Sequence, residues 1–184
     1  MTITLLAKKG GVGKSTLAIL LFEAFRHAGK SVALHDWDAQ GTSSKTLKLL
    51  GATSSDRLPD IVLYDTPPNL DHIATATAVR HADIVLVVTT PSPSDIWEVE
   101  DAVQFVQHRN ATAMIRIAFN KVRQTTRLGR LVEESAKQMS VPALPVTVSA
   151  RECYQHAVGQ GWRALDSAAR EEVLQFTVAL LSLN

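Results

Sequence analysis

The stretch LLAKKGGVGKSTL, residues 5–17, joins an apolar run to a helical pattern through a glycine-rich turn. Such a turn is typical of phosphate-binding loops, whose common pattern is G-x-x-x-x-G-K-[ST]. Residues 13–15 supply the Gly-Lys-Ser end of that pattern. Its first glycine position, however, holds Lys8, and Lys9 follows before two glycines. The loop therefore begins with two cations that the common pattern does not contain.

Several physical features of this loop favour phosphate binding. Glycines let backbone N–H groups point inward at phosphate oxygens, and the N-terminus of the following helix adds favourable partial charge. Lys14 is expected to reach the terminal phosphates of a nucleotide, and the Ser15 hydroxyl is expected to bind Mg²⁺. A turn without a ligand is the alternative. The predicted nucleotide contacts are Gly10, Gly11, Val12, Gly13, Lys14, Ser15 and Thr16.

The composition fits an ordinary globular protein. A chain of 184 residues suits one domain, here expected to span 1–184. Its net charge of +1 does not by itself indicate a nucleic-acid partner, so any basic surface must be local. One cysteine, Cys153, excludes a disulfide framework within the chain. No signal peptide and no membrane-spanning apolar run is apparent, so a cytoplasmic protein is expected.

Apolar runs alternate with helical patterns along the chain. Strands are expected at 2–7, 30–36, 60–65, 83–90, 113–120 and 143–148. Helices are expected at 14–29, 44–51, 70–81, 91–107, 126–139, 151–159 and 166–182. This alternation predicts an α/β fold with a parallel sheet and helices on both faces. Ligands of such folds bind at the carboxyl ends of the strands.

Three carboxylates follow the second and third predicted strands. Asp65, in LYDTPP, ends an apolar strand and is placed to hold Mg²⁺ directly or through water. Asp36 and Asp38, in HDWDAQG, face one side if the segment is extended. One would hold the water shell of the metal while the other orients the attacking water. A solvated turn is the alternative, and Trp37 between them is interpreted as a packing residue.

The segments KKGGVGKST, DWDAQG and DTPP, in this order and spacing, resemble the deviant Walker A ATPases. Within that family the sequence is most similar to the ParA-type partition ATPases, especially the small plasmid kind without an N-terminal DNA-binding domain. The similarity extends to residues 88–101 and 119–131, so it covers most of the chain. It implies a P-loop NTPase fold and slow, partner-stimulated hydrolysis of Mg²⁺-bound ATP by a homodimer that forms in the ATP state.

The resemblance also implies a role for the early lysine. Lys9 matches the signature lysine of the family, which crosses to the nucleotide of the partner subunit in a face-to-face dimer. A cation would thereby be supplied to phosphate charge that develops during hydrolysis. Lys8 falls where the family often has Gln or Pro, and we expect it to be mostly exposed. Lys9, Lys14 and Asp38 are the implied catalytic residues.

Further roles follow from the same match. Asp38 resembles the water-positioning carboxylate, and Asn120 resembles an adenine-contacting side chain, with a strand-end cap as the alternative. The implied metal site contains Ser15, Asp36 and Asp65. Two departures stand out: Ala39 replaces a common proline, and the segment 41–60 is short where relatives usually carry a further strand or helix. The short segment predicts a trimmed sheet edge.

A local basic region is expected in the second half of the chain. Residues 102–132 contain six Lys or Arg side chains and no Asp or Glu. Cations that contact phosphates bind DNA without reading its sequence, and the resemblance implies such binding by the ATP dimer. A solvated helix face paired with nearby acids is the alternative. The predicted DNA-binding residues are Lys121, Arg123, Arg127, Arg130, Arg151 and Arg163, with Arg127 and Arg130 as first choices.

Several functions remain open at this stage. The main interpretation is a nucleoid-associated ATPase that segregates a plasmid or chromosome with a ParB-like adaptor. The alternative is positioning of a carboxysome or another protein cargo. A MinD-like membrane regulator is disfavoured, because the last 14 residues lack Lys and Arg, and no membrane partner is expected. A metabolic ligase, a nitrogenase-type reductase and a binding module without hydrolysis are less favoured.

Overall fold

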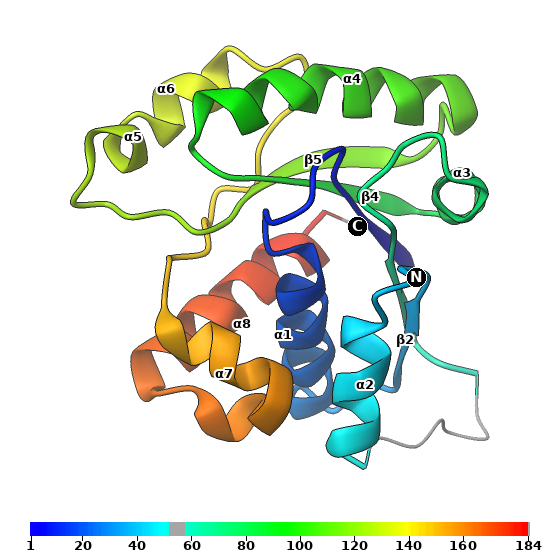
Figure 1. Cartoon of the computed structure of the whole chain (residues 1–184), viewed down its shortest axis with the longest axis vertical. Helices are drawn as coiled ribbons and strands as arrows, with labels where there is room; N and C mark the ends of the chain where they lie inside the picture. Colours follow the sequence, from blue (N-terminus) through cyan, green and yellow to red (C-terminus); the bar gives the residue numbers. More distant parts are fainter. Residues whose placement is uncertain (52–57, 184) are drawn as a thin grey trace.

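The computed structural model describes residues 1–51 and 58–183. Across these residues it contains a five-stranded parallel sheet in the order β2-β3-β1-β4-β5 (Figure 1). The strands are β1 (Thr2–Leu6), β2 (Val32–Asp36), β3 (Ile61–Asp65), β4 (Ile84–Thr89) and β5 (Met114–Phe119). The predicted α/β fold with a parallel sheet is confirmed.

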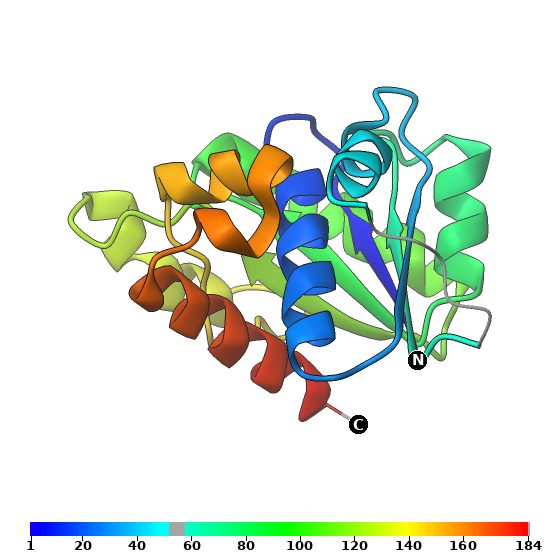
Figure 2. The ribbon, with the colours of Figure 1, turned by 90° about the horizontal axis from the view of Figure 1, so that it is seen from below.

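Helices cover both faces of this sheet (Figures 1 and 2). One face carries α1 (Lys14–His27), α2 (Thr42–Leu49), α7 (Glu152–Gln160), the 3-10 helix η1 (Gly161–Ala164) and α8 (Ser167–Leu181). The other carries α3 (Ile73–Arg80), α4 (Pro93–Arg109), α5 (Arg127–Arg130) and α6 (Val132–Lys137). In the part of the chain described, none of these helices combines the length and apolar character needed to span a bilayer.

Strand β4 shows why the sheet is covered on both sides. Ile84, Leu86 and Val88 point into the core beneath α1 and α8, whereas Val85 and Val87 point into the core beneath α4. Successive side chains of a strand face opposite sides, so a strand buried on both faces needs a continuous apolar sequence. The run IVLVVT meets this need and fixes β4 near the centre of the sheet.

The strand expected at 143–148 is wrong. The segment runs beside β5 but forms one isolated parallel bridge with it, between Ala143 and Ile117, and a second bridge follows just beyond it, between Ser149 and Val122. Pro145 lies between these bridges and has no N–H to donate to a ladder. The proline therefore prevents a sixth strand within the described residues, although the segment still covers the edge of β5.

The single helix expected over 126–139 is also wrong, because it is divided into α5 and α6 at Leu131. The Leu131 N–H donates to the Leu128 carbonyl at 3.2 Å, a contact three residues back instead of four. Gly129 packs against the backbone of Arg123, where a Cβ would lie 2.0 Å from the carbonyl oxygen. The close approach holds α5 as a separate short turn against the segment after β5.

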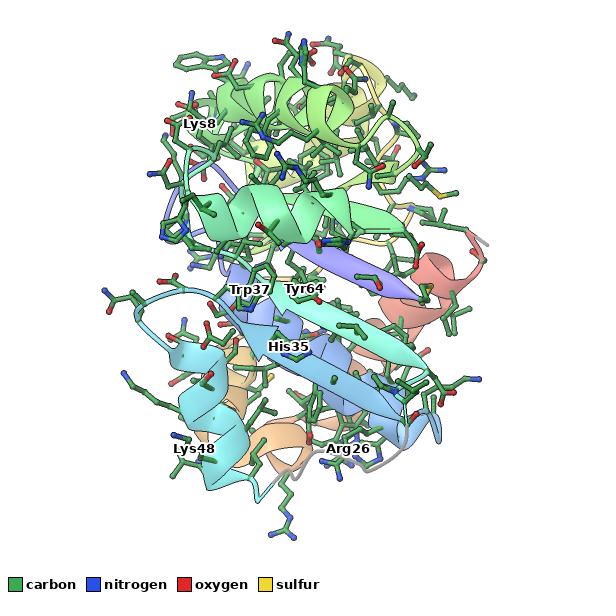
Figure 3. All side chains as sticks on the ribbon, turned by 90° about the vertical axis from the view of Figure 1, so that its right-hand side faces the viewer. Lys8, Arg26, His35, Trp37, Lys48 and Tyr64 are labelled. Carbon is green, nitrogen blue, oxygen red and sulfur yellow. The ribbon has the colours of Figure 1, made fainter. Side chains whose placement is uncertain are left out.

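Within the described residues, β2 is the edge strand of the sheet opposite to β5. Figure 3 shows His35, Trp37 and Tyr64 on the face of β2 and β3 turned toward the viewer. The Tyr64 ring lies 5.3 Å from that of His35 and 4.5 Å from that of Trp37. Trp37 thus packs on its neighbours, as expected. Part of the short 41–60 segment, residues 52–57, lies outside the described residues.

Candidate nucleotide-binding site

The loop between β1 and α1 is held in a shape that only glycine tolerates. Gly11 and Gly13 have φ values of 84° and 87°, in the left-handed region. A Cβ on Gly13 would lie 2.4 Å from the side-chain nitrogen of Asn120. That nitrogen donates to the Val12 carbonyl at 2.8 Å. The carboxyl end of β5 therefore fixes the loop that leaves β1.

Lys14 has its amine in a buried polar cluster. Its side chain is 6% exposed, and Nζ lies 3.2 Å from Oδ1 of the fully buried Asp65. Nζ also donates to the Thr66 carbonyl. The second oxygen of Asp65 accepts a 2.7 Å hydrogen bond from Ser43. Buried charges are tolerated when they are paired and hydrogen-bonded. These contacts link α1, α2 and β3 through the carboxylate of Asp65.

Asp36, which ends β2, and Asp38, two residues later, shape the turn that leads into α2. Asp36 accepts hydrogen bonds from the backbone N–H groups of Asp38, at 3.0 Å, and Ser44, at 2.8 Å. Asp38 in turn accepts from the Gln40 N–H at 3.0 Å. Asp36 is paired in register with Asp65 on the neighbouring strand. The three predicted carboxylates therefore gather at one end of adjacent strands.

Lys9 is engaged within its own chain. Its amine donates to the Ser94 carbonyl at 3.0 Å and lies 3.5 Å from Oδ1 of Asp95, in the first turn of α4. The other oxygen of Asp95 accepts a 2.6 Å hydrogen bond from Thr90. Because the Lys9 side chain is 39% exposed, this ion pair contributes little to stability. The lysine is thus held at the surface by contacts that can exchange.

Lys8 was expected to be mostly exposed, but its side chain is 39% exposed and its amine has two acidic partners. It forms ion pairs with Glu98 and Asp101, one and two turns further along α4 than Asp95. Hydrogen bonds to Asp101 and Glu98 raise the pKa of Lys8 above its ordinary value. Both extra cations of the loop therefore meet the acidic side of one helix.

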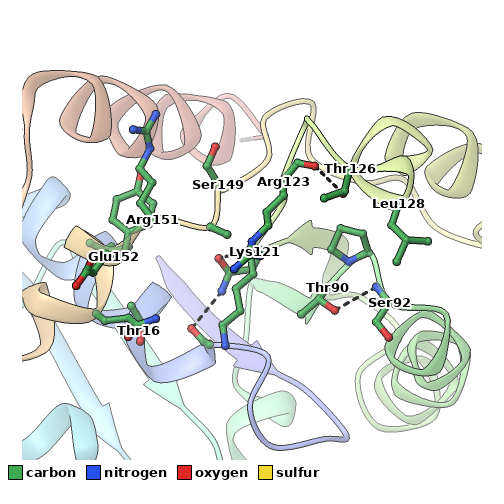
Figure 4. Close-up of a pocket in the computed structure, with 17 residues that line it drawn as sticks. Thr16, Thr90, Ser92, Lys121, Arg123, Thr126, Leu128, Ser149, Arg151 and Glu152 are labelled. Atoms are coloured by element: carbon green, nitrogen blue, oxygen red, sulfur yellow. Dashed lines mark hydrogen bonds between the residues drawn. The ribbon is translucent and has the colours of Figure 1, made fainter.

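A pocket of about 790 Å³ opens beside the phosphate-binding loop (Figure 4). Its wall combines the loop after β4, the segment after β5 and the start of α7. Asn120 lies in the wall and accepts a 2.9 Å hydrogen bond from the N–H of Lys121. Lys121, with a φ of 56°, donates through Nζ to the Gly11 carbonyl at 2.7 Å. Pockets of this size accommodate small organic ligands.

The six cations predicted to bind DNA occupy different places. Lys121, Arg123 and Arg151 line the pocket, and Arg151 also lies 3.5 Å from Glu172 of α8. The remaining three are exposed outside it: Arg127 and Arg130 in α5, and Arg163 in η1. The structure therefore does not bring all six onto one surface.

The residues present fit Mg²⁺ and a nucleoside triphosphate. Ser15 lies in the first turn of α1, Thr16 lines the pocket, and Lys14 stands beside Asp65. Across the described residues, no three His, Cys, Asp or Glu side chains form a ready cluster for a metal. Magnesium bound with a nucleotide takes most of its ligands from water and phosphates, so the carboxylates and Ser15 suffice as protein partners.

Sequence reasoning missed Ser43, Asp95 and Glu172. Each holds a predicted residue in place and lies far from it in the sequence. Ser43 and Asp95 do carry a weak local signal, because each is a polar residue in the first turn of a helix that follows a site strand. Glu172 carries none, because a glutamate on a C-terminal helix is ordinarily solvated.

Comparisons with solved structures show the fold. A Borrelia burgdorferi B31 protein described as a plasmid partition protein and bound to AMPPNP superposes with a TM-score of 0.84 and 18% identity, covering 100% of this chain and 99% of that one. Cobyrinic acid a,c-diamide synthase from Mycobacterium smegmatis, with bound ADP and magnesium, superposes with a TM-score of 0.78 and 17% identity. The match covers 98% of this chain and 93% of that one.

Sequence comparisons show the family. Two curated relatives are both named Maintenance of carboxysome distribution protein A. The Halothiobacillus neapolitanus protein is 23% identical over 192 residues, and the Gloeobacter kilaueensis protein is 29% identical over 193. Each match covers 92% of this chain and 88% of the relative. The pattern of the CobQ/CobB/MinD/ParA nucleotide binding domain matches residues 3–161, and the chain therefore belongs to that nucleotide-binding family.

Proposed function

We propose that residues 1–184 form one ATPase domain that binds Mg²⁺-ATP, dimerises in that state and hydrolyses the nucleotide slowly until a partner protein stimulates it. The observation that supports this most is the buried contact of Lys14 with Asp65 at the base of the loop. It places a cation and a carboxylate next to backbone N–H groups, where terminal phosphates and a metal bind together.

The residues of the chain bind, orient and position in this proposal. Mg²⁺-ATP supplies the bond to be cleaved and a divalent charge. Lys14 contacts the terminal phosphates, while Ser15 and Asp65 hold the metal, with Asp36 ordering its water shell. Asp38, in the turn after β2, orients the attacking water. Asn120 fixes the loop and faces the pocket in which the base would lie.

Lys9 makes hydrolysis depend on the dimer in this proposal. In the single chain its amine is bound to Ser94 and Asp95. In the ATP-bound dimer Lys9 leaves these contacts and reaches the nucleotide of the partner subunit. Because the Lys9 side chain is 39% exposed and its ion pair with Asp95 is weak, the exchange costs little, and the phosphate charge of ATP favours it. Hydrolysis then depends on dimerisation.

The work of such a switch is to position a cargo on DNA. The two curated relatives, named for carboxysome distribution, support a carboxysome or similar protein cargo more than a plasmid. We therefore place the protein at the nucleoid in the cytoplasm, acting with an adaptor that stimulates hydrolysis. Arg127, Arg130 and Arg163, which are exposed, remain the predicted DNA contacts outside the pocket.

Binding to random-sequence duplex DNA tests this proposal. It should be measured with ATP, with ADP and without nucleotide, at two salt concentrations. Binding that requires ATP and weakens with salt is expected, because phosphate contacts release counterions. Equal binding in all three nucleotide states, or no binding in any, would contradict the DNA-bound switch. Hydrolysis measured on the same samples separates that failure from a failure of the ATPase itself.

A further inference from the structure

One carboxylate of the C-terminal helix holds a wall of the pocket. Glu172, on α8, accepts hydrogen bonds from the backbone N–H of Ser149 at 2.7 Å and from its hydroxyl at 2.6 Å. It also accepts from the hydroxyl of Tyr154 at 2.7 Å, and it lies 3.5 Å from Arg151. Ser149, Arg151 and Tyr154 all line the pocket, whereas Glu172 stands behind them. Figure 4 shows Ser149 and Arg151 on this side.

The segment that forms this wall is held at one end by backbone hydrogen bonds and along the rest by α8. It follows the stretch that Pro145 keeps out of the sheet. Three backbone hydrogen bonds join it to the end of β5 and to the residues after β5: from Val148 to Phe119 at 2.9 Å, from Val122 to Val148 at 3.0 Å and from Ala150 to Val122 at 2.9 Å. From Ser149 to Tyr154, α8 supplies the side-chain anchors: Glu172 accepts from the hydroxyls of Ser149 and Tyr154, and the Tyr154 hydroxyl also lies 3.2 Å from the Ala169 carbonyl. The position of the wall thus depends on α8.

The charges around Glu172 make these contacts strong. Burial of Arg151 opposes its charge, but the carboxylate of Glu172, with other nearby acids, more than offsets this and raises the pKa of Arg151. Burial and the hydrogen bond to Glu172 raise the pKa of Tyr154, so its hydroxyl stays a donor. Hydrogen bonds to an ionised acceptor are stronger than neutral ones. The single negative charge of Glu172 therefore contacts three neutral donors and one cation.

We propose that Glu172 is a positioning residue for the nucleoside half of the nucleotide-binding site. It sets the wall from Ser149 to Tyr154 against which the base and ribose lie, while the loop after β1 binds the phosphates. The inference rests on the proposed function, because it assumes that the pocket receives a nucleotide. Glu172 lies beyond residues 3–161, the part of the chain that the family pattern matches. A helix outside that pattern thereby becomes part of the site.

The test separates the two halves of the ligand. Binding of Mg²⁺-ATP and of Mg²⁺-tripolyphosphate, which lacks base and ribose, is measured by calorimetry for the wild type and for Glu172→Gln. Gln keeps the shape but removes the charge, so ATP affinity should fall about tenfold. Tripolyphosphate affinity should stay within about twofold, since it uses the phosphate-binding loop alone. A merely structural role would lower both affinities together.

Glu171→Gln is the matched control, because Glu171 is an exposed neighbour whose carboxylate accepts a hydrogen bond from Gln175 on the same helix. It should leave both affinities unchanged. If Glu172→Gln does not fold, Tyr154→Phe removes one donor and keeps the ring, and the same selective loss, about threefold, is expected. Unchanged ATP affinity, or equal loss for both ligands, would overturn the role of Glu172. A wild-type protein that binds no ATP would instead overturn the proposed function.

Discussion

Lys14 and Lys9 stand five residues apart in the same loop and differ in what surrounds their amines. The Lys14 side chain is 6% exposed and lies beside the fully buried Asp65. The Lys9 side chain is 39% exposed, and its partners are a carbonyl and the partly exposed Asp95. One cation is fixed in the interior at the ends of the strands, and the other rests on the surface of α4.

The difference separates the binding part of the site from its switching part. Breaking a buried pair leaves an uncompensated charge and costs about 3–5 kcal/mol, so Lys14 stays where it is. Exposed pairs contribute at most about 1 kcal/mol, so Lys9 moves readily once another anion competes. The same short loop thus provides a fixed phosphate-binding group and an exchangeable one.

Lys14→Met, which removes the buried cation, should have the largest effect on stability and on ATP binding. The substitution leaves Asp65 buried without its cation, so stability should fall by about 3–5 kcal/mol, and ATP binding should be abolished. Chemical denaturation and calorimetry measure the two effects. Adding Asp65→Asn removes the stranded charge and should restore much of the stability without restoring binding. A Lys14→Met protein that binds ATP normally would contradict the fixed role of Lys14.

Asp38→Ala tests the turn after β2 next. The variant should bind ATP and dimerise, yet lose about 100-fold in hydrolysis, because general-base positioning contributes roughly that much. A phosphate-release assay beside a sedimentation run distinguishes the two steps. Ala39→Pro serves as a control, since it alters the same turn and keeps the carboxylate. Wild-type turnover in Asp38→Ala would remove Asp38 from the mechanism.

Ser43→Ala tests the buried contacts around Lys14 and Asp65 and should have a smaller effect. The fully buried Ser43 donates to Asp65 at 2.7 Å, and a hydrogen bond to a charged group contributes about 1.5–3 kcal/mol. Affinity for Mg²⁺-ATP should fall about tenfold, with a larger demand for free Mg²⁺. Titration with Mg²⁺ at constant ATP measures this. The control Ser44→Ala changes the half-buried neighbour, whose contribution to the site is a backbone N–H, and it should show no such change.

Neutralising Arg127 and Arg130 should have the smallest effect. Changing both to Gln should weaken DNA binding several-fold for every sequence and flatten its salt dependence. ATP binding should not change, because both side chains lie outside the pocket. Fluorescence anisotropy with two unrelated duplexes provides the measurement. Undiminished DNA binding would show that DNA contacts another surface, and Arg163 would be the next residue to test.

The site residues that could be predicted from the sequence are those whose positions depend on local sequence patterns. A Gly-Lys-Ser turn between a strand and a helix fixes the place of Lys14, and strand ends fix Asp36 and Asp65. Contacts between distant segments were not predictable, such as Glu172 with Ser149 or Asp95 with Lys9, because no local pattern links them. The expected strand at 143–148 failed because one proline outweighs its apolar pattern.

The exchange of Lys9 is the central claim, and sedimentation velocity tests it most directly. The wild type should be monomeric with ADP and dimeric with ATP under conditions that prevent hydrolysis. Asp95→Asn should dimerise at lower ATP concentrations, since it weakens the contact within the chain. Lys9→Gln should bind ATP and stay monomeric, whereas the control Lys8→Gln should dimerise. Dimerisation of Lys9→Gln at wild-type ATP concentrations would contradict the account.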